Sequence, residues 1–383
     1  MRFSKRRTDS ITEMDLAQLA PVGGNWLDRL SGEKPRLLVH AFKTTLAAAI
    51  AWYVAVALGL HDGYWAVITV IIVLQSYVGA TVTASRDRAI GTLVGAAVGF
   101  AFSLYTTLPW NFLLALLVST ILCVLLGLKN STRLAGVTVV IILIAQKSGT
   151  NYTIAIHRVL EVLLGIAIAL AVSTLVLPER ARMRLREGLA EEFLQLGVFF
   201  EAVLQGFSGE PNERLGQLRA QCDARRRANN QLMETARNEP AGGRGVLEAL
   251  GLLMQFARSL RDALAALELS VRDSHNDNYA RQLEPELGKL AADIHAAFHF
   301  VAGCIHRWRF NQPSGKINLA AGIEALEVKM EAVRHTGNSF SQEEVLRAYA
   351  VHLHLTQLAR TLRTVRAEAG KALAANKPGE ETV

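Results

Sequence analysis

The sequence contains little cysteine, and its three cysteines form no pattern. Cys123, Cys222 and Cys304 lie far apart in the chain and include no C-x-x-C pair. A disulfide framework and a metal site built from thiolates are therefore both excluded. The lack of paired cysteines also indicates that the polar second half of the chain is built for a reducing compartment.

The sequence also lacks the short motifs of common nucleotide-dependent and hydrolytic enzymes. It has no G-x-x-x-x-G-K-[ST] run, no G-x-G-x-x-G after a strand pattern and no G-x-S-x-G elbow. His295 and His299 have i, i+4 spacing, with Cys304 and His306 beyond, but no acidic residue completes a metal motif, so an amphipathic helix face is favoured. We expect no enzyme activity, no cofactor and no metal.

The chain is basic, but its polar half is nearly neutral. Residues 1–178 hold 14 Lys/Arg and 8 Asp/Glu, a balance of +6, whereas residues 179–383 hold 27 and 26, a balance of +1. A DNA-binding protein usually carries its positive charge on a polar domain, so nucleic acid is not an expected partner. The Arg225-Arg226-Arg227 run indicates a solvated helix surface or a contact with anionic lipid.

Long apolar stretches fill the first half of the chain and predict an all-α membrane protein. Most of them reach the ~20 residues that a helix needs to cross a ~30 Å hydrocarbon layer, but the second and fifth are shorter. The alternative is a buried helical core, which would need polar faces that these stretches lack. The six predicted spans are residues 37–60, 64–79, 89–106, 110–128, 134–148 and 159–177.

The distribution of Lys and Arg predicts the orientation of these spans. Basic residues precede the first span, follow the sixth, and lie between spans two and three and between spans four and five. The connectors 61–63 and 106–109 contain none, so both termini are expected in the cytoplasm. The predicted domains are a cytosolic segment 1–36, a transmembrane domain 37–178 and a cytosolic α-helical domain 179–383.

The second half of the chain has the charged, periodic pattern of a helical bundle. Breaks rich in Gly, Pro, Ser or Asn separate the helices, and Ser341 with Glu344 predicts a capping box. The predicted helices are residues 183–207, 212–237, 245–272, 279–309, 317–335 and 341–373.

The membrane half contains an internal repeat with a shift of 70 residues. Between 64–103 and 134–173, 12 of 40 positions are identical, including Arg88 with Arg158 and Gly95 with Gly165. Each copy holds three spans, an odd number, so the second copy enters the membrane with opposite polarity, as in many transporters. Gly91, Gly95, Gly99 and Gly165 also have the spacing of smooth faces for helix packing, which is the favoured role of these glycines.

Cations near membrane depth are the candidate contacts for a substrate. They are Lys43, Arg88, Lys147 and Arg158, and an organic anion is a suitable partner because guanidinium groups match carboxylates. Lys43 has the alternative of extending to lipid headgroups. Arg88 is the best candidate, because the residue one turn later is Gly91 rather than an acid, although Asp87 and Asp62 could serve as its partners in the fold.

Glu161 is the only carboxylate inside a predicted span, and it lies one turn after Arg158. It is a candidate proton carrier for coupled export, although an ion pair that holds Arg158 is the favoured alternative. Trp65 and Gln75 are candidates for stacking and hydrogen bonds along the short second span, with ordinary helix contacts as the alternative.

Several segments resemble the FUSC family, the group of fusaric acid resistance proteins and aromatic acid exporters. They are Tyr64-Trp65-Ala66-Val67-Ile68-Thr69-Val70 with Gln75 and Gly79, Arg88-x-x-Gly91-Thr92-x-x-Gly95, Arg158-Val159-Leu160-Glu161, and Asn238-Glu239-Pro240. The resemblance implies an inner-membrane exporter of organic anions, aromatic carboxylic acids above all. Many members carry two membrane units, so it also implies a homodimer here, and a periplasmic adaptor protein is a further expected partner.

Three hypotheses follow from the resemblance and the cations together. The first is a secondary transporter driven by the proton-motive force. The second is a passive anion channel, in the manner of the distantly similar malate channels of plants. The third is a membrane-anchored scaffold without transport.

Overall fold

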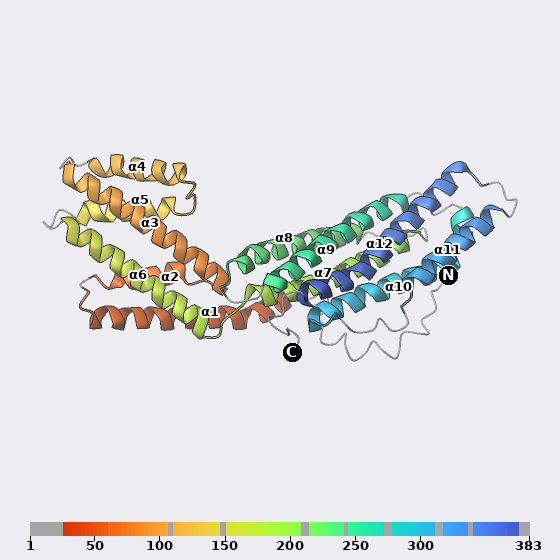
Figure 1. Ribbon diagram of the computed structural model, residues 1–383, viewed down its shortest axis with the longest axis horizontal. Helices are drawn as coiled ribbons and strands as arrows, with labels where there is room; N and C mark the ends of the chain where they lie inside the picture. The colour runs from red at the N-terminus through yellow and green to blue at the C-terminus, as the bar shows by residue number, and fades with distance from the viewer. Residues whose placement is uncertain are drawn as a thin grey trace, which may run out of the picture. The chain divides into compact units, whose positions relative to one another are not determined.

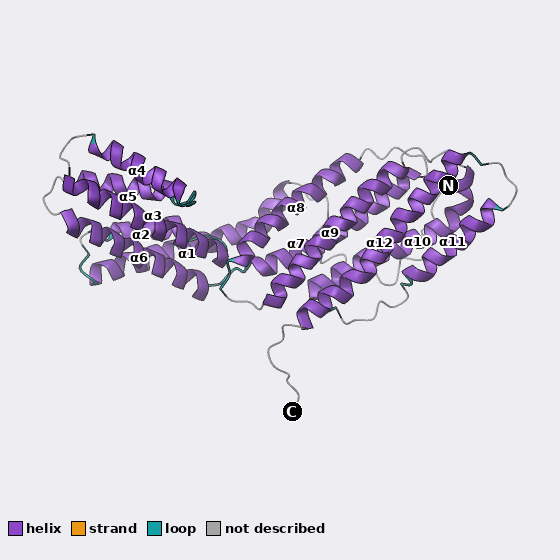
Figure 2. Ribbon diagram, turned by 45° about the horizontal axis from the view of Figure 1, so that its top comes forward, coloured by secondary structure: helices purple, strands orange, loops and turns teal. Residues whose placement is uncertain are grey.

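The structure is a computed structural model that describes residues 26–60, 62–105, 110–145, 151–207, 214–240, 244–271, 278–310, 317–335 and 340–374. Within these ranges all regular structure is helical, and no strand is present (Figures 1 and 2). The helices are α1 (Trp26–Ala57), α2 (Tyr64–Val73), α3 (Val78–Tyr105), α4 (Asn111–Leu125), α5 (Thr132–Ala145), α6 (Asn151–Leu175), α7 (Ala181–Phe207), α8 (Leu215–Arg237), α9 (Arg244–Val271), α10 (Asn278–Arg307), α11 (Leu319–Arg334) and α12 (Gln342–Ala374).

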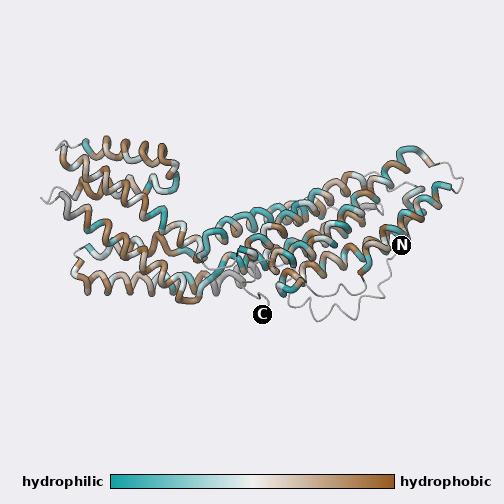
Figure 3. The backbone as a smooth tube through the Cα atoms, viewed as in Figure 1, coloured by the Kyte–Doolittle hydropathy of each residue, from teal (hydrophilic) through white to brown (hydrophobic). Residues whose placement is uncertain are grey.

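The chain divides into two compact units between Glu179 and Arg180. Helices α1 to α6 form the first unit, and Figure 3 shows that hydrophobic residues predominate along them. Helices α7 to α12 form the second unit, where hydrophilic residues alternate with apolar ones along each helix. We call them the membrane unit and the polar unit.

Three described helices of the membrane unit are long and apolar enough to cross a bilayer: Leu37–Ala57, Val78–Leu104 and Ala155–Leu175. The other three apolar segments, Tyr64–Val73, Asn111–Leu125 and Thr132–Ile144, are shorter. At 1.5 Å per residue, the 10 residues of α2 extend about 15 Å, half of a hydrocarbon layer. The second and fifth segments are therefore short, as the sequence predicts, and the fourth is shorter than predicted.

Helix packing in the membrane unit repeats itself. The first helix, α1, packs on α2 and α6, and α4 packs on α5 and α3. In the same way, α2 packs on α6, and α5 packs on α3. If α1, α2 and α3 are exchanged with α4, α5 and α6 respectively, the same pairs of helices are packed together. The pair of α3 with α6 is its own equivalent under this exchange.

Two glycines of the repeat make equivalent close contacts. A Cβ on Gly95 of α3 would lie 2.4 Å from the Ala135 carbonyl oxygen and 2.7 Å from Thr138 Cβ, both on α5. A Cβ on Gly165 of α6 would lie 2.6 Å from the Ala66 carbonyl oxygen and 2.8 Å from Thr69 Cβ, both on α2. These glycines let the short helices α5 and α2 approach the long ones within a distance that no other residue allows.

Helices α3 and α6 run antiparallel along their contact. Near the start of α3, Thr81 accepts a hydrogen bond of 3.3 Å from Ser173 near the end of α6. Further along α3, Ala96 belongs to an apolar cluster with Ala155, near the start of α6. The two helices with the repeated arginines thus share one long interface.

The polar unit is an antiparallel helical bundle around one large apolar core. On α9, for example, Leu253, Leu260, Leu264 and Leu267 are buried at intervals of seven, four and three residues, which places them on one helix face. All six helices lie within a few residues of the predicted ranges. The Ser341 hydroxyl accepts from the Glu344 amide at 3.1 Å, but the Glu344 carboxylate accepts from the Tyr279 amide, so only one half of the predicted capping box forms.

The Asn238-Glu239-Pro240 segment joins the end of α8 to the beginning of α7. The amide of Ala181, at the first turn of α7, donates to the Glu239 carboxylate, and Arg182 Nε lies 3.6 Å from the same carboxylate. Arg182 also donates to the carbonyl oxygens of Ala236 and Glu239, at 3.3 Å each. Burial raises the pKa of Glu239, and the hydrogen bond from Ala181 and the charge of Arg182 oppose that rise.

Candidate functional site

A stripe of polar side chains lies along α3 inside the membrane unit. Thr81, Ser85, Arg88 and Thr92 are all buried, at successive intervals of four, three and four residues. This spacing places the four side chains on one face of the helix. The hydrogen bond between Thr81 and Ser173 shows that this face is directed at α6. The α3–α6 interface is therefore polar at its centre, although both helices are apolar in composition.

Arg88 is the central residue of this stripe and carries an unneutralised charge. Its side chain is only 3% exposed, and it makes no hydrogen bond or ion pair within the part of the chain that the structure describes. The buried hydroxyls of Ser85 and Thr92, one turn before and one turn after it, have no partner there either. A cation and two hydroxyls that all lack partners form the kind of polar cluster that binds an anion.

The repeat-equivalent arginine, Arg158 on α6, is neutralised within the protein. Its Nη1 lies 3.3 Å from Glu161 Oε2, so the ion pair expected from their spacing is present. Its guanidinium carbon lies 3.9 Å from the centre of the Trp65 ring on α2, a cation–π contact. Asp62, just before α2, is a second acid near Arg158. We call Arg158, Glu161 and Trp65 the α6 cluster.

The two arginines differ because the repeat is broken at two positions. A shift of 70 residues maps Glu161 onto Gly91 and Trp65 onto Ala135. A Cβ on Gly91 would lie 2.8 Å from the Ser131 carbonyl oxygen and 3.2 Å from the Ala135 amide nitrogen, so the α5 backbone occupies the space that an acid would need. The packing of α5 thus excludes an internal partner for Arg88.

The two arginines are close enough to interact electrostatically across the interior. Like charges in a low-dielectric interior repel each other strongly, and the two acids that act on this pair, Glu161 and Asp62, both lie near Arg158. Arg88 is therefore the member of the pair that no acid neutralises in the described chain. Its surroundings have the electrostatic character of an anion site.

The structure brings some of the predicted site residues together and separates others. Arg88, Arg158, Glu161 and Trp65 lie in the interior formed by α2, α3 and α6. Lys43 on α1 is buried, and its ammonium donates to the Leu177 carbonyl oxygen just beyond α6. Gln75 is exposed in the link between α2 and α3. Lys147 lies outside the described residues.

The sequence analysis did not single out Ser85 and Thr92. A signal was available, because small polar residues recur at helical spacing on both sides of Arg88. It was weak, since Ser and Thr are common in membrane helices, where their hydroxyls bond to carbonyl groups of the same helix. Thr83, for example, donates to the Gly79 carbonyl oxygen at 3.0 Å.

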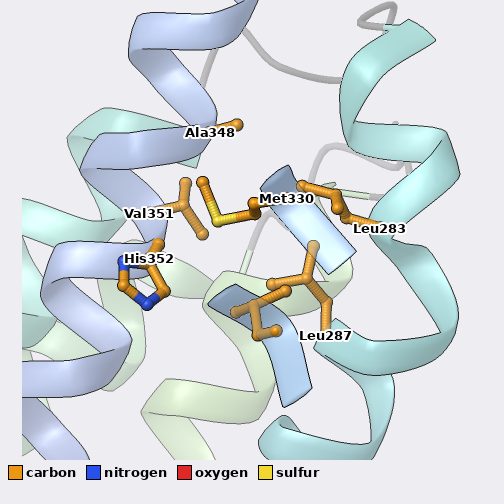
Figure 4. Close-up of a pocket in the computed structure, with 7 residues that line it drawn as sticks. Leu283, Leu287, Met330, Ala348, Val351 and His352 are labelled. Carbon is orange, nitrogen blue, oxygen red and sulfur yellow. The ribbon is translucent and has the colours of Figure 1, made fainter. Parts of the chain in front are cut away.

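The closed cavity found in the described part of the polar unit is too small for an organic anion. A cavity of about 10 Å³ lies between α10, α11 and α12, lined by Leu283, Leu287, Leu326, Met330, Ala348, Val351 and His352 (Figure 4). This volume holds one water molecule at most. His295 and His299 pack edge to face with ring centres 4.7 Å apart, and no group of three metal-ligating residues occurs in the described chain.

An all-helical fold, long apolar helices and a buried cationic interior define an α-helical membrane protein. The chain belongs to the fusaric acid resistance protein family (FUSC), whose model matches residues 37–381. Similar proteins include the inner membrane protein YccS of Escherichia coli (strain K12), which is 23% identical over 338 residues. That match covers 85% of this chain and 44% of YccS.

Other relatives are named as transporters. Aluminum-activated malate transporter 2 of Arabidopsis thaliana is 28% identical over 193 residues, which cover 45% of this chain and 38% of that protein. The uncharacterized transporter YdhK of Escherichia coli (strain K12) is 30% identical over 138 residues, which cover 33% of this chain and 21% of YdhK. The chain spans less than half the length of each of these relatives.

Proposed function

We propose that this chain forms one membrane unit of a transporter for organic anions, and that a carboxylate of the anion binds at Arg88. The observation that carries the proposal is the buried Arg88 guanidinium, which has no partner in the described chain. An unpaired charge at membrane depth costs ~2.5–3.5 kcal/mol on insertion scales. A bound carboxylate offsets that cost through two parallel hydrogen bonds, with Ser85 and Thr92 as further donors.

The packing of the membrane unit supports an inverted repeat of three helices. The packed pairs are unchanged when the two halves are exchanged, and α3 and α6 run antiparallel at the centre. In such transporters the substrate binds where the repeats meet, and short helices mark the path. Arg88 lies at that interface, and α2 and α5 are the short helices. We propose six spans with both termini in the cytoplasm.

The finer proposal is export of aromatic carboxylic acids across a bacterial inner membrane, coupled to the proton-motive force. Family membership supports this substrate class. Similarity to YccS, which is named as an inner membrane protein, supports the location in that membrane. The chain spans 44% of YccS, so we propose that a second copy supplies the other membrane unit of a homodimer. A periplasmic adaptor protein remains a proposed partner of that assembly.

A passive anion channel is the second candidate, and the malate transporter relatives favour it. The two candidates share Arg88 and differ in their energy source. An exporter moves its substrate against a gradient when a proton gradient is imposed. A channel carries a current that reverses at the equilibrium potential of the anion and continues without a proton gradient.

Flux in proteoliposomes tests the role of Arg88. The protein is reconstituted, and efflux of a panel of radiolabelled carboxylates, including benzoate and malate, is measured with and without a proton gradient. We expect Arg88→Ala to reduce flux of the transported anion at least about tenfold, since a hydrogen bond to a charged group contributes about 1.5–3 kcal/mol. Arg88→Lys should retain part of the flux, because it keeps the charge but loses the bidentate geometry.

Arg86→Ala is the matched control, because Arg86 is exposed on the same helix, two residues away. It removes the same charge from the chain and should leave flux unchanged. Equal flux in the parent, Arg88→Ala and Arg86→Ala would refute the proposed site. Absence of anion flux from the parent, with every carboxylate tested, would instead favour a scaffold.

A further inference from the structure

We infer that Arg158 is a second carboxylate-binding site, which in this structure is occupied by a tethered carboxylate, that of Glu161. The inference rests on the proposed function, because it describes the next step of the same anion path. Arg158 and Glu161 are 5% and 1% exposed, so the pair lies within the protein rather than on its surface. Glu161 reaches Arg158 from the same helix, three residues on, and so needs no other element to hold it there.

The α6 cluster contains the parts of a complete carboxylate site. Arg158 Nη1 donates to the Glu161 carboxylate. Trp65 covers one face of the guanidinium at 3.9 Å, which leaves the donors in the plane of the group free to bind oxygen atoms. These contacts recognise a carboxylate as such, whether it is tethered or free.

The site is only partly filled by Glu161. Arg158 Nε is buried and has no partner, so the carboxylate uses one edge of the guanidinium and leaves a donor unused. A free carboxylate can bind with two parallel hydrogen bonds, a geometry that a side chain on the same helix does not reach here. The unused donor is the observation that indicates a ligand beyond Glu161.

The positions of Arg88 and Arg158 indicate what the Glu161 carboxylate does on the proposed anion path. Arg88 and Arg158 lie on α3 and α6, which pack against each other, so we place Arg158 after Arg88 on the proposed anion path. Movement through a path requires sites that bind an anion well enough to accept it and weakly enough to release it. A tethered carboxylate weakens the second site, because the incoming anion must displace it. Glu161 therefore acts as an internal competitor at Arg158.

Binding measured in an Arg88→Ala background tests this inference separately from transport. Purified full-length protein in detergent is titrated with sodium benzoate, at constant ionic strength, and the melting temperature is followed. We expect Arg88→Ala alone to show little saturable stabilisation. Arg88→Ala/Glu161→Gln should show saturable stabilisation with an apparent affinity at least about tenfold higher, because the apparent affinity is the intrinsic affinity multiplied by the fraction of molecules whose site is open.

Three controls make the result specific. Addition of Arg158→Ala to the double variant should abolish the stabilisation, and neutral benzamide should not reproduce it. Arg88→Ala/Glu161→Asp keeps a tethered carboxylate and should resemble Arg88→Ala alone. If Glu161→Gln does not fold, the same titration is made with Glu161→Ala expressed and purified in benzoate. Its recovery as a monodisperse protein only with benzoate supports the inference.

Two results would overturn the inference. One is a folded Arg88→Ala/Glu161→Gln protein that shows no saturable response to benzoate. The other is a response that persists when Arg158 is replaced. A failure of the proposed function has a different signature, since flux would then be independent of Arg88 while benzoate still bound at Arg158 in the double variant.

Discussion

At the scale of single residues, a buried charge is explained by what surrounds it. Arg158 and Glu161 neutralise each other, and Arg182 and Glu239 do so in the polar unit. Arg88 is buried to the same degree and has no such neighbour in the described chain. Charges that are matched stabilise a fold only modestly, whereas an unmatched charge is retained when function requires it. This contrast separates the candidate site from the structural ion pairs.

The Arg182–Glu239 pair allows a pH test outside the membrane helices. Because burial raises the pKa of Glu239 in the folded protein, the folded state binds this proton more tightly than the unfolded state. Its contribution to stability is therefore complete below the ordinary pKa of glutamate and is lost as the pH rises through the folded-state pKa. We expect Glu239→Gln to flatten the pH dependence of the melting temperature in this window. The variant should be destabilised by about 1–3 kcal/mol at low pH and by less as the pH rises through the window.

Melting curves of the full-length protein in detergent at a series of pH values measure this effect. Glu234→Gln is the control, because Glu234 lies in the last turn of α8, just before the segment that contains Glu239, and its side chain is 72% exposed. The control should change neither the stability nor its pH dependence. An unchanged pH slope in Glu239→Gln would show that other groups set it.

At the scale of helices, the sequence analysis succeeded where the determining interactions are local. Apolar runs and breaks located the six polar-unit helices and the short α2, and i, i+3 spacing located the Arg158–Glu161 pair. The contacts it missed are non-local. Trp65 meets Arg158, and Lys43 meets Leu177, across more than 90 residues in each case. No periodicity within one helix can reveal which face of a second helix will cover it.

The glycine contacts between helices give a prediction at this scale. Gly95→Ala and Gly165→Ala each place a methyl group within 3 Å of backbone oxygen on the short helices α5 and α2. The backbones must move apart, so we expect each variant to be destabilised by about 1–3 kcal/mol, the usual cost of overpacking. Thermal aggregation in detergent, followed by size-exclusion chromatography, measures the loss.

Gly288→Ala is the matched control, because this helical glycine has no atom within 4 Å of the added Cβ. It should be neutral or stabilising by up to about 1 kcal/mol, since alanine favours a helix over glycine. Similar losses in the two α3 and α6 variants would agree with equivalent roles in the repeat. If both variants were as stable as the control, the inference of close packing at these glycines would be wrong.

At the scale of the whole molecule, the proposal depends on helices that are shorter than a bilayer. Helix α4 has 15 residues, or about 22 Å, against a hydrocarbon layer of about 30 Å. A short helix can still cross where polar residues at its ends thin the bilayer or meet the headgroups. If α4 does not cross, the chain has an odd number of spans, and the repeat cannot be inverted.

Labelling at the two ends of α4 decides this point. Trp110 precedes the helix, Lys129 follows it, and both are exposed. We expect Trp110→Cys to react with a membrane-impermeant maleimide from outside the cell, and Lys129→Cys to react only after the membrane is permeabilised, as the Lys and Arg distribution predicts. The native cysteines are buried, and burial raises the pKa of the Cys222 thiol to about 11, which keeps it unreactive at neutral pH. The parent protein is therefore the control that should not be labelled. Labelling of both variants from the same side would show that α4 does not cross the membrane. The two halves would then have the same polarity, and the proposed anion path, which requires an inverted repeat, would be refuted.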